Sequence, residues 1–222
     1  MNLGTPDPLR AIANYRQLAL TYDASCRHVE SIRIETVALL GLRRGDHVLD
    51  VASGTGMSFP ALRSGVGNEG AVVGIELSPD MCARARERVQ VAGWTNVQVV
   101  EADALTAQLH QCRFDAVLFH YTHDVLRQPA TLHRLLSFAK PGARIAVAGF
   151  KAAPGWAVPL TWFSMWRARK YLTTFEGLRA PWSHLVQWVP DFEWQPRLGG
   201  SGYVGWGHTR TAELPAPLNR EA

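Results

Sequence analysis

Two patterns of hydrophobic positions alternate along this chain between residues 12 and 150. Segments in which apolar residues recur every three or four positions are typical of helices, and they cover 12–40, a short stretch ending near Ser64, 79–92 and 131–139. Short runs of mostly apolar residues are typical of buried strands, and they cover 47–52, 71–76, 97–101, 114–120 and 144–150. Strands that alternate with helices in this way predict a parallel sheet with helices on both faces.

The pattern changes after residue 150. Residues 156–189 are expected to form two helices rich in Trp, Leu, Arg and Lys, with a break near Pro181. Two alternating segments, 192–197 and 203–209, flank a Gly-rich turn and predict an antiparallel hairpin that closes the sheet. The expected fold is therefore an α/β domain with a doubly wound, mostly parallel sheet of about seven strands, an aromatic-rich helical insertion after the fifth strand and a C-terminal hairpin.

The domain boundaries follow from the same pattern. We expect a flexible N-terminus over residues 1–14, a single domain over 15–210 and a disordered tail over 211–222. Only one of the eight tryptophans precedes residue 156. This concentration of aromatic residues makes 151–190 the candidate for a lid or a segment that binds the acceptor substrate.

Charge and cysteine content exclude several classes of protein. Lys and Arg number 23 against 19 Asp and Glu, and a net charge of +4 is too small to indicate a nucleic-acid partner. A run of about 20 apolar residues, which a transmembrane helix needs, is missing. The N-terminus also lacks the basic start and apolar run of a secretory signal. The three cysteines are far apart, so we expect reduced thiols in a cytoplasmic protein without a metal centre.

Candidate chemistry lies where the predicted strands end, because ligands of open parallel sheets bind there. The first strand leads from Asp50 into a loop with Gly54 and Gly56, and glycines let a ligand approach the backbone closely. A dinucleotide loop normally has a third glycine, but Phe59 stands at that position. Asp50 would also repel a pyrophosphate. The loop therefore favours a ligand without phosphate that carries a positive amino group, such as S-adenosylmethionine (SAM).

Three further strand ends carry polar residues. Glu76 can accept hydrogen bonds from both hydroxyls of a ribose. Asp103, which is followed by the small Ala104, can accept a hydrogen bond from the exocyclic amine of an adenine. The segment 119–124, Phe-His-Tyr-Thr-His-Asp, ends the fourth strand next to where a transferred group would lie.

The order and spacing of these motifs resemble class I SAM-dependent methyltransferases. The chain reads V-L-D-V-A-S-G-T-G, then V-V-G-I-E-L-S-P-D-M, V-V-E-A-D-A, F-D-A-V-L-F and A-K-P-G-A-R-I-A-V. The resemblance covers about residues 15–150 and is strongest to the branch that methylates quinones, phospholipid headgroups and related small molecules. Ala52 stands where the family has its first loop glycine, and His120 stands where many members have Asn or Asp. The resemblance implies a Rossmann-like fold and SAM as cofactor, with S-adenosylhomocysteine (SAH) as the product.

The resemblance also assigns a role to each matching position. Asp50 lies near the methionine amino group, Glu76 binds the ribose, Leu77 packs near the adenine, and Phe119 and His120 face the sulfonium. The remaining cofactor-binding positions are Ala52, Gly54 and Gly56 in the loop, Asp103 and Ala104 beside the adenine, and Tyr15 and Tyr22 in a covering N-terminal segment.

Simpler interpretations stay open for several of these residues. Asp50 and Glu76 can be acids at strand ends with solvent partners, and Asp103 can cap the helix that follows it. Tyr22 can pack the N-terminal helix on the core.

His120 and His123 are the candidate catalytic residues, as a general base near the acceptor. In the alternative, His120 contacts only the cofactor and Asp124 caps the next helix. A metal site formed by these three residues is disfavoured, because their spacing binds metal best on a helix and this segment leaves a strand.

The acceptor is expected to bind to residues 154–188. Their aromatic side chains, Trp162, Phe163, Trp166, Tyr171 and Phe175, can form an apolar wall or cover the sheet edge. The basic residues Arg167, Arg169 and Lys170 can hold an anion, contact a membrane surface or face water. A cationic nitrogen over an aromatic ring is also chemically reasonable.

The expected reaction is in-line transfer of a methyl group from SAM to an N, O or C nucleophile of a small molecule or a lipid headgroup. The alternatives are a SAM-binding fold with other chemistry, such as cyclisation, a regulatory SAM-binding protein, and an NAD-dependent oxidoreductase, against which the missing third glycine argues. Peripheral membrane contact is conceivable, and the chain is expected to be a monomer or a homodimer.

Overall fold

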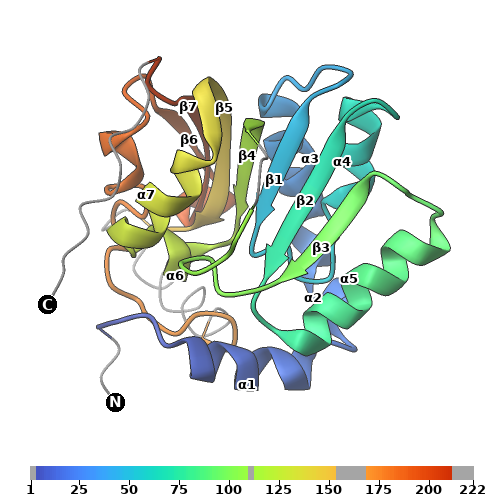
Figure 1. Ribbon diagram of the computed structural model, residues 1–222. Coiled ribbons are helices and arrows are strands. Elements are labelled where there is room, and N and C mark those ends of the chain that lie inside the picture. Colours follow the sequence, from blue (N-terminus) through green and yellow to red (C-terminus); the bar gives the residue numbers. More distant parts are fainter. Residues whose placement is uncertain (1–3, 110–112, 154–168, 212–222) are drawn as a thin grey trace, which may run out of the picture.

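One mixed sheet organises the chain. The computed structural model describes residues 4–109, 113–153 and 169–211. Seven strands form a sheet in the order β3-β2-β1-β4-β5-β7-β6 (Figure 1). The first five run parallel, and β7 runs antiparallel to both β5 and β6. The strands are β1 (His47–Val51), β2 (Ala71–Glu76), β3 (Val97–Glu101), β4 (Phe114–His120), β5 (Ala139–Phe150), β6 (Glu193–Arg197) and β7 (Gly202–His208).

Helices cover both faces of the sheet. The α-helices are α1 (Pro8–Leu18), α2 (Tyr22–Cys26), α3 (Glu30–Leu39), α4 (Phe59–Val66), α5 (Pro79–Val91), α6 (His123–Leu126) and α7 (Pro129–Ser137). Three short 3-10 turns are η1 (Arg27–Val29), η3 (Leu185–Gln187) and η4 (Leu198–Gly200). In Figure 1, α6 and α7 lie in front of β4 and β5, while α3 and α4 lie behind the sheet. This arrangement is the predicted doubly wound α/β fold.

The two faces of the sheet have separate hydrophobic cores. Val48 and Leu118 pack in one core with residues of α3 and α4, whereas Leu49 and Phe119 pack in the other with residues of α7 and of the segment after β5. Because successive side chains of a strand point to opposite faces, Asp50 lies on the same face as Val48, and the residue after Phe119 lies on the α3 face. This alternation decides where the polar residues at the strand ends go.

The strand order reverses between β1 and β4, which lie side by side although two strands separate them in sequence. Open α/β sheets bind ligands at the carboxyl ends of the strands beside such a reversal. In Figure 1 these ends point toward α1, which crosses below β1, β2 and β3. Residues of α1 and residues at these strand ends line one cavity.

Most predicted elements are confirmed. Strands β2, β3 and β4 have the predicted bounds, and β6 and β7 form the predicted antiparallel hairpin. Ser78 precedes α5, and its hydroxyl accepts a hydrogen bond from the backbone N–H of Met81 at 3.5 Å. These agreements arise because buried parallel strands carry continuous apolar runs that are easily recognised in a sequence.

The predicted helix over 12–40 is wrong in its continuity and its start. Three helices and a 3-10 turn replace it, and α1 begins at Pro8 within the segment 1–14 that was expected to be flexible. Pro8 stands at the first position of α1, and Asp7 caps it by accepting a hydrogen bond from the backbone N–H of Arg10 at 3.0 Å. A cap and a proline at the first position both favour a helix that begins at this point.

The second of the two helices predicted over 156–189 is also wrong. Residues 169–189 form turns and the single 3-10 turn η3, while 154–168 lie outside the described residues, as does 212–222 of the expected disordered tail. Gly177 has a φ of 74°, which interrupts a helix, and Pro181 follows shortly after it. Trp182 and Leu185 instead pack into the core on the α7 face of the sheet, so tertiary burial replaces helix formation here.

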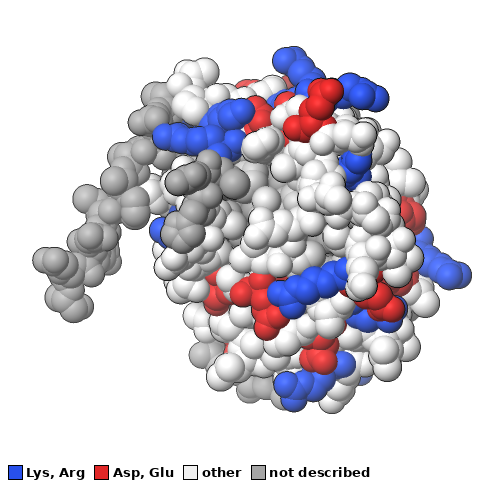
Figure 2. Space-filling model, turned by 45° about the vertical axis from the view of Figure 1, so that its right-hand side comes forward, with Lys and Arg blue, Asp and Glu red and all other residues white. Residues whose placement is uncertain are grey.

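The charges on the surface and the polarity of the helices bear on the nucleic-acid and membrane partners considered from the sequence. On the face shown in Figure 2, basic side chains lie among acidic ones. Ion pairs at the protein surface include Arg84–Glu87 and Arg86–Glu101. Within the three described ranges, the helices are too short or too polar to cross a membrane.

We expect Gly74→Ala in β2 to destabilise the fold. An added Cβ would lie 2.6 Å from Cζ of Phe59 and 2.7 Å from Oγ of Ser53, and Phe59 is fully buried. The phenyl ring must therefore shift, which lowers the free energy of unfolding by about 1–3 kcal/mol in urea denaturation. Gly149→Ala in β5 is the matched control. A Cβ added there would lie 3.2 Å from Cε1 of Tyr203, so the ring has to move much less. Equal losses in the two variants would contradict this explanation.

Candidate active site

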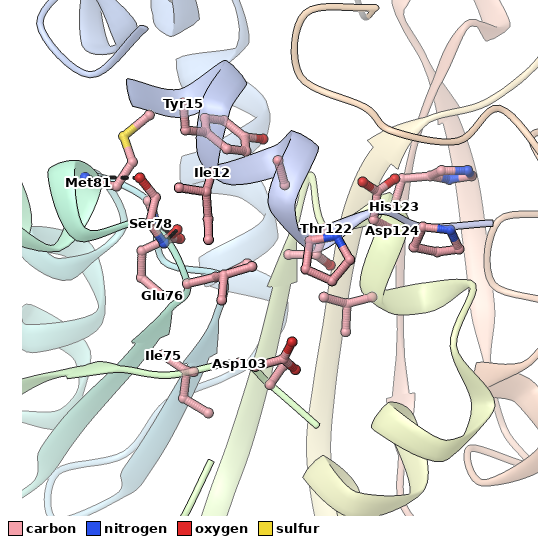
Figure 3. Close-up of a pocket in the computed structure, with 18 of the residues that line it drawn as sticks. Ile12, Tyr15, Ile75, Glu76, Ser78, Met81, Asp103, Thr122, His123 and Asp124 are labelled. Atoms are coloured by element: carbon pink, nitrogen blue, oxygen red, sulfur yellow. Dashed lines mark hydrogen bonds between the residues drawn. The ribbon is translucent and has the colours of Figure 1, made fainter. Parts of the chain in front are cut away.

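A large cavity lies at the carboxyl ends of the strands. Its empty space is about 960 Å³, including the part open to solvent. It is lined from the N-terminal helices by Ile12, Tyr15 and Tyr22, from the strand ends by Ala52, Gly54, Glu76, Leu77, Asp103 and Ala104, and from the end of β4 by His120, Tyr121, Thr122, His123 and Asp124. Figure 3 shows Ile12 and Tyr15 of α1 on one side, with Glu76 and Asp103 across the cavity from them. Most of the predicted site residues are therefore brought together.

The loop after β1 is held against the end of β2. The backbone N–H of Gly54 donates to Oε2 of Glu76 at 2.9 Å, and the N–H of Ser53 donates to the carbonyl of Ile75 at 2.9 Å. Ala52 and Gly54 both have left-handed backbones, with φ of 51° and 58°. Ala52 thus adopts the conformation that its glycine counterpart would adopt without strain. The loop turns tightly and keeps its backbone at the cavity wall.

Glu76 is buried at the end of β2 and fixed through both carboxylate oxygens. Its second oxygen, Oε1, accepts from the N–H of Ser78 at 2.8 Å. Burial raises the pKa of this carboxyl, while the backbone hydrogen bonds from Ser78 and Gly54 oppose the rise. A carboxylate that faces a cavity and retains free lone pairs can accept further hydrogen bonds from a ligand hydroxyl.

Asp50 behaves differently from Glu76. It points to the α3 face, is only 2% exposed, and does not line the cavity. No atom of the described residues is hydrogen-bonded to its Oδ2. Burial raises the pKa of Asp50 to about 7, partly opposed by the positive charge of Arg33. A buried, unpartnered carboxyl of this kind is costly to the fold and is typical of functional sites.

Two other residues assigned by the resemblance lie outside the cavity wall. Gly56, with φ of 75°, turns the chain so closely against Phe59 that an added Cβ would lie 2.5 Å from its ring. Phe119 is fully buried in the core on the α7 face. Both residues shape the site from behind, and the structure does not bring them into contact with the cavity.

Asp103 has two roles. One oxygen, Oδ1, accepts from the N–H of Leu105 at 2.7 Å, and its carbonyl accepts from the N–H of Ala107 at 2.8 Å. It thereby fixes the turn after β3, whereas the simpler interpretation from sequence expected a helix for Asp103 to cap at this point. Its side chain also lies at the cavity, beside Ala104.

The N-terminal helices are tied to the loop after β1. Asp23 of α2 accepts from the hydroxyl of Thr55 at 2.5 Å and pairs with Arg88 of α5 at 2.5 Å. The ring of Tyr22 stands next to Gly54, since an added Cβ there would lie 3.7 Å from it. These contacts place an aromatic ring over the loop.

The segment after β5 is joined to the same region. The hydroxyl of Thr173 donates to Oδ2 of Asp124 at 2.6 Å and accepts from the N–H of Asp7 at 2.9 Å. The hydroxyl of Tyr15 donates to the carbonyl of Tyr171 at 3.1 Å. Asp124 therefore anchors the covering segment rather than capping α6.

The two candidate catalytic histidines have different partners. Nδ1 of His120 lies 3.2 Å from a guanidinium nitrogen of Arg33, and Nε2 of His123 lies 3.0 Å from the carbonyl of Glu176. Burial lowers the pKa of His120 well below its usual value and that of His123 to about 4. Both imidazoles are therefore neutral near pH 7. Across the described ranges, three or more His, Cys, Asp or Glu residues nowhere gather as they would around a metal ion.

A second cavity adjoins the first. Its empty space is about 520 Å³, including open solvent, and it shares Tyr15, Tyr22, His120, Tyr121, His123, Tyr171 and Leu172 with the large cavity. Its own lining residues are Cys26, His28, Val29, Arg33 and Phe150. Its wall is mainly aromatic, with polar atoms concentrated at the end of β4.

Sequence reasoning missed Arg33, Asp23 and Thr173. A signal existed for Arg33, because it lies four residues after Val29 and four before Val37, both buried, and so occupies the apolar stripe of its helix. Asp23 and Thr173 reach partners more than 30 residues away, for which the sequence offers no local pattern.

The family profile and the relatives that match this chain are all methyltransferases in the following comparisons. The profile of a methyltransferase domain family matches residues 42–172. A demethylmenaquinone methyltransferase of Shouchella clausii is 32% identical over 122 residues, which are 54% of this chain and 52% of that protein. A protein-L-isoaspartate O-methyltransferase of Ignicoccus hospitalis is 32% identical over 160 residues, or 70% of this chain and 71% of that protein.

A solved structure supports the fold. The crystal structure of a SAM-dependent methyltransferase from Aquifex aeolicus matches with a TM-score of 0.58 at 21% identity, over 91% of this chain and 98% of that one. At that identity the likeness concerns the fold alone. The chain spans about half the length of the demethylmenaquinone methyltransferase.

We expect Asp50→Asn to stabilise the ligand-free protein more at pH 8 than at pH 5. Because its folded-state pKa is near 7 and its usual value is 3.8, ionisation of Asp50 costs the fold increasingly as the pH rises between these values. The variant removes this cost, so its stability relative to the native protein improves by roughly 2 kcal/mol between the two pH values. Urea denaturation at both pH values measures the difference.

Asp115→Asn is the control for this measurement. The N–H of His47 and the Lys140 ammonium hold the pKa of Asp115 below 3.8 despite its partial burial, so its stabilising effect is complete at pH 5 and at pH 8. Its replacement therefore destabilises the fold equally at both values. If Asp50→Asn shows the same pH-independent change as Asp115→Asn, Asp50 does not titrate in this range.

Proposed function

Because the chain belongs to the class I SAM-dependent methyltransferases, we propose that it transfers a methyl group from SAM to an oxygen or carbon nucleophile of a small aromatic acceptor. One observation carries this proposal. Gly54, Glu76 and Asp103 come from three different strand ends and line one cavity beside the reversal of strand order.

The cavity has the chemistry that SAM requires. Glu76 and Asp103 provide carboxylate oxygens for a ribose and an adenine amine, and Leu77 provides an apolar surface beside them. Ala52 and Gly54 expose a left-handed backbone where the amino acid part of the ligand would lie.

Asp50 provides a second test of this fit. Its buried and unpartnered oxygen lies behind the loop, and a positively charged amino group bound at the loop would favour the ionised form of this carboxyl. A neutral or anionic ligand would not relieve the cost of its burial. The site therefore favours a ligand with a cationic amino group.

When bound, SAM supplies a methyl group on a sulfonium that is already activated for attack by a nucleophile. The chain's own residues align the two partners and exclude water. Tyr22 lies beside Gly54 of the loop after β1, and Thr173 ties the segment after β5 to Asp124 and to the start of α1. Such positioning is the main contribution that a protein makes to a transfer of this type.

The second cavity is the proposed acceptor site. Its aromatic wall, formed by Tyr15, Tyr22, Tyr121, Phe150 and Tyr171, suits a flat ring better than an exposed lipid headgroup. The name of the Shouchella clausii relative, a demethylmenaquinone methyltransferase, supports a quinone-like acceptor. Tyr171 belongs to the predicted acceptor segment 151–190, whose residues 154–168 lie outside the described structure.

A methyl-transfer assay tests the function. The protein is incubated with SAM carrying a labelled methyl group and with 1,4-dihydroxynaphthalene under reducing conditions, and labelled product is identified by mass spectrometry. Phosphoethanolamine and phosphatidylethanolamine vesicles form parallel arms for headgroup acceptors. We expect label in the naphthalene product and SAH in equal amount. Label found only in a headgroup arm would contradict the aromatic acceptor and indicate a headgroup acceptor. SAM binding without any methyl transfer would favour a regulatory role.

We expect Glu76→Gln to weaken SAH binding at least tenfold in isothermal titration calorimetry. The substitution removes the charge that strengthens hydrogen bonds to ligand hydroxyls, and an amide has only one oxygen for the two N–H groups of Gly54 and Ser78. Glu101→Gln is the matched control, because Glu101 is the neighbour of Glu76 in β3 but pairs with Arg86 at the surface. Unchanged affinity in Glu76→Gln would remove this residue from the proposed site.

A further inference from the structure

A buried arginine lies behind the end of β4. Arg33 of α3 is 7% exposed and lines the second cavity. Its guanidinium pairs with Glu30 at 3.1 Å, donates to the hydroxyl of Ser58 at 3.3 Å, and lies 3.2 Å from Nδ1 of His120. Nε of Arg33 contacts Glu30, and a single terminal nitrogen contacts both Ser58 and His120, so two of its nitrogens hold the guanidinium in place.

This contact determines where His120 carries its proton. A guanidinium can only donate hydrogen bonds, and it stays protonated in proteins. Nδ1 of His120 must therefore accept, which leaves the proton of the neutral imidazole on Nε2. That Nε2 is buried and has no hydrogen-bond partner in the described structure, while His120 lines both cavities. The group that His120 can offer a ligand is an N–H donor.

His123 also carries its proton on Nε2, but in this residue Nε2 is the nitrogen that already has a partner. The carbonyl of Glu176 can only accept, so Nε2 of His123 must carry the proton and donate to it. Nδ1 of His123 is buried, and no described atom is hydrogen-bonded to it. His123 is 4% exposed and lines both cavities. The group that His123 can offer a ligand is a lone pair.

We propose that Arg33 is a positioning residue that fixes His120 as a hydrogen-bond donor, so that the acceptor site presents one donor from His120 and one acceptor from His123. This inference rests on the proposed function and narrows its substrate class. An uncharged ring with a hydroxyl satisfies both groups, because it can donate to Nδ1 of His123 and accept from Nε2 of His120. An ether that lacks the hydroxyl leaves the lone pair of His123 unpaired, which weakens binding.

Nuclear magnetic resonance measures the imidazole protonation directly. Long-range correlation of ring protons with ring nitrogens distinguishes a protonated Nε2 from a protonated Nδ1 in ¹⁵N-labelled protein. In the native protein with SAH we expect both His120 and His123 to carry the proton on Nε2. In Arg33→Met we expect His120 to shift toward the Nδ1-protonated form, while Arg33→Lys, which still donates, keeps the native pattern. His123 is the internal control and stays unchanged.

Two results would overturn the role of Arg33. One is a native His120 that carries its proton on Nδ1 or on both nitrogens. The other is a His120 pattern that is the same in Arg33→Met as in the native protein. The first measurement needs no variant, so it holds even where Arg33→Met does not fold. If SAH does not bind, the proposed function fails, whereas the protonation pattern of the ligand-free protein still decides the role of Arg33.

The ligand class has its own test. We expect 1,4-dihydroxynaphthalene to bind the SAH-loaded protein at least fivefold more tightly than 1,4-dimethoxynaphthalene, because one hydrogen bond to His123 is lost with the ether. His120→Gln, whose amide N–H can replace the Nε2 donor, should keep the affinity for the dihydroxy compound within about threefold, and His120→Leu should lower it at least fivefold. Equal affinity for the two naphthalenes, or binding of neither, would overturn the proposed ligand class.

Discussion

The two-residue alternation of side chains along buried strands is the constraint on which the site depends. In β1 and β4 it sends Asp50 and His120 to the face covered by α3, and it sends Leu49 and Phe119 into the opposite core. Since both faces of a parallel sheet are covered, a polar side chain near a strand end is buried whichever way it points. Arg33 meets His120 for this reason, and the two cavities share the wall at the end of β4.

The covering elements are held by polar contacts between distant parts of the chain. Asp23 joins α2 to the loop after β1 and to α5, and Thr173 joins the segment after β5 to Asp124 and to the start of α1. Each contact is partly exposed or at the edge of the cavity. Hydrogen bonds in such positions contribute modestly to stability.

The same region carries groups that the fold alone does not satisfy. Oδ2 of Asp50, Nε2 of His120 and Nδ1 of His123 are buried, and within residues 4–109, 113–153 and 169–211 nothing is hydrogen-bonded to them. Buried polar atoms are normally paired, because leaving one unpaired costs about 1–3 kcal/mol. Two of these three residues, His120 and His123, line both cavities, where a ligand could pair with them. A methyltransferase whose acceptor must be desolvated before transfer has a direct use for such groups.

The sequence by itself determined the strands, their alternation with helices and most of the residues that line the large cavity. Buried strands need continuous apolar runs, and Glu76, Gly54 and Asp103 are marked by their place directly after such runs. Tertiary structure alone decided the break of the N-terminal helix, the turns at 169–189 and the direction of Asp50, Phe119 and His120. It also decided the protonation of His120, because that depends on Arg33, which lies 87 residues away in the chain. The local spacing of hydrophobic residues shows whether a segment is a helix or a strand. The partner of a buried polar group depends instead on which elements pack together in the folded chain.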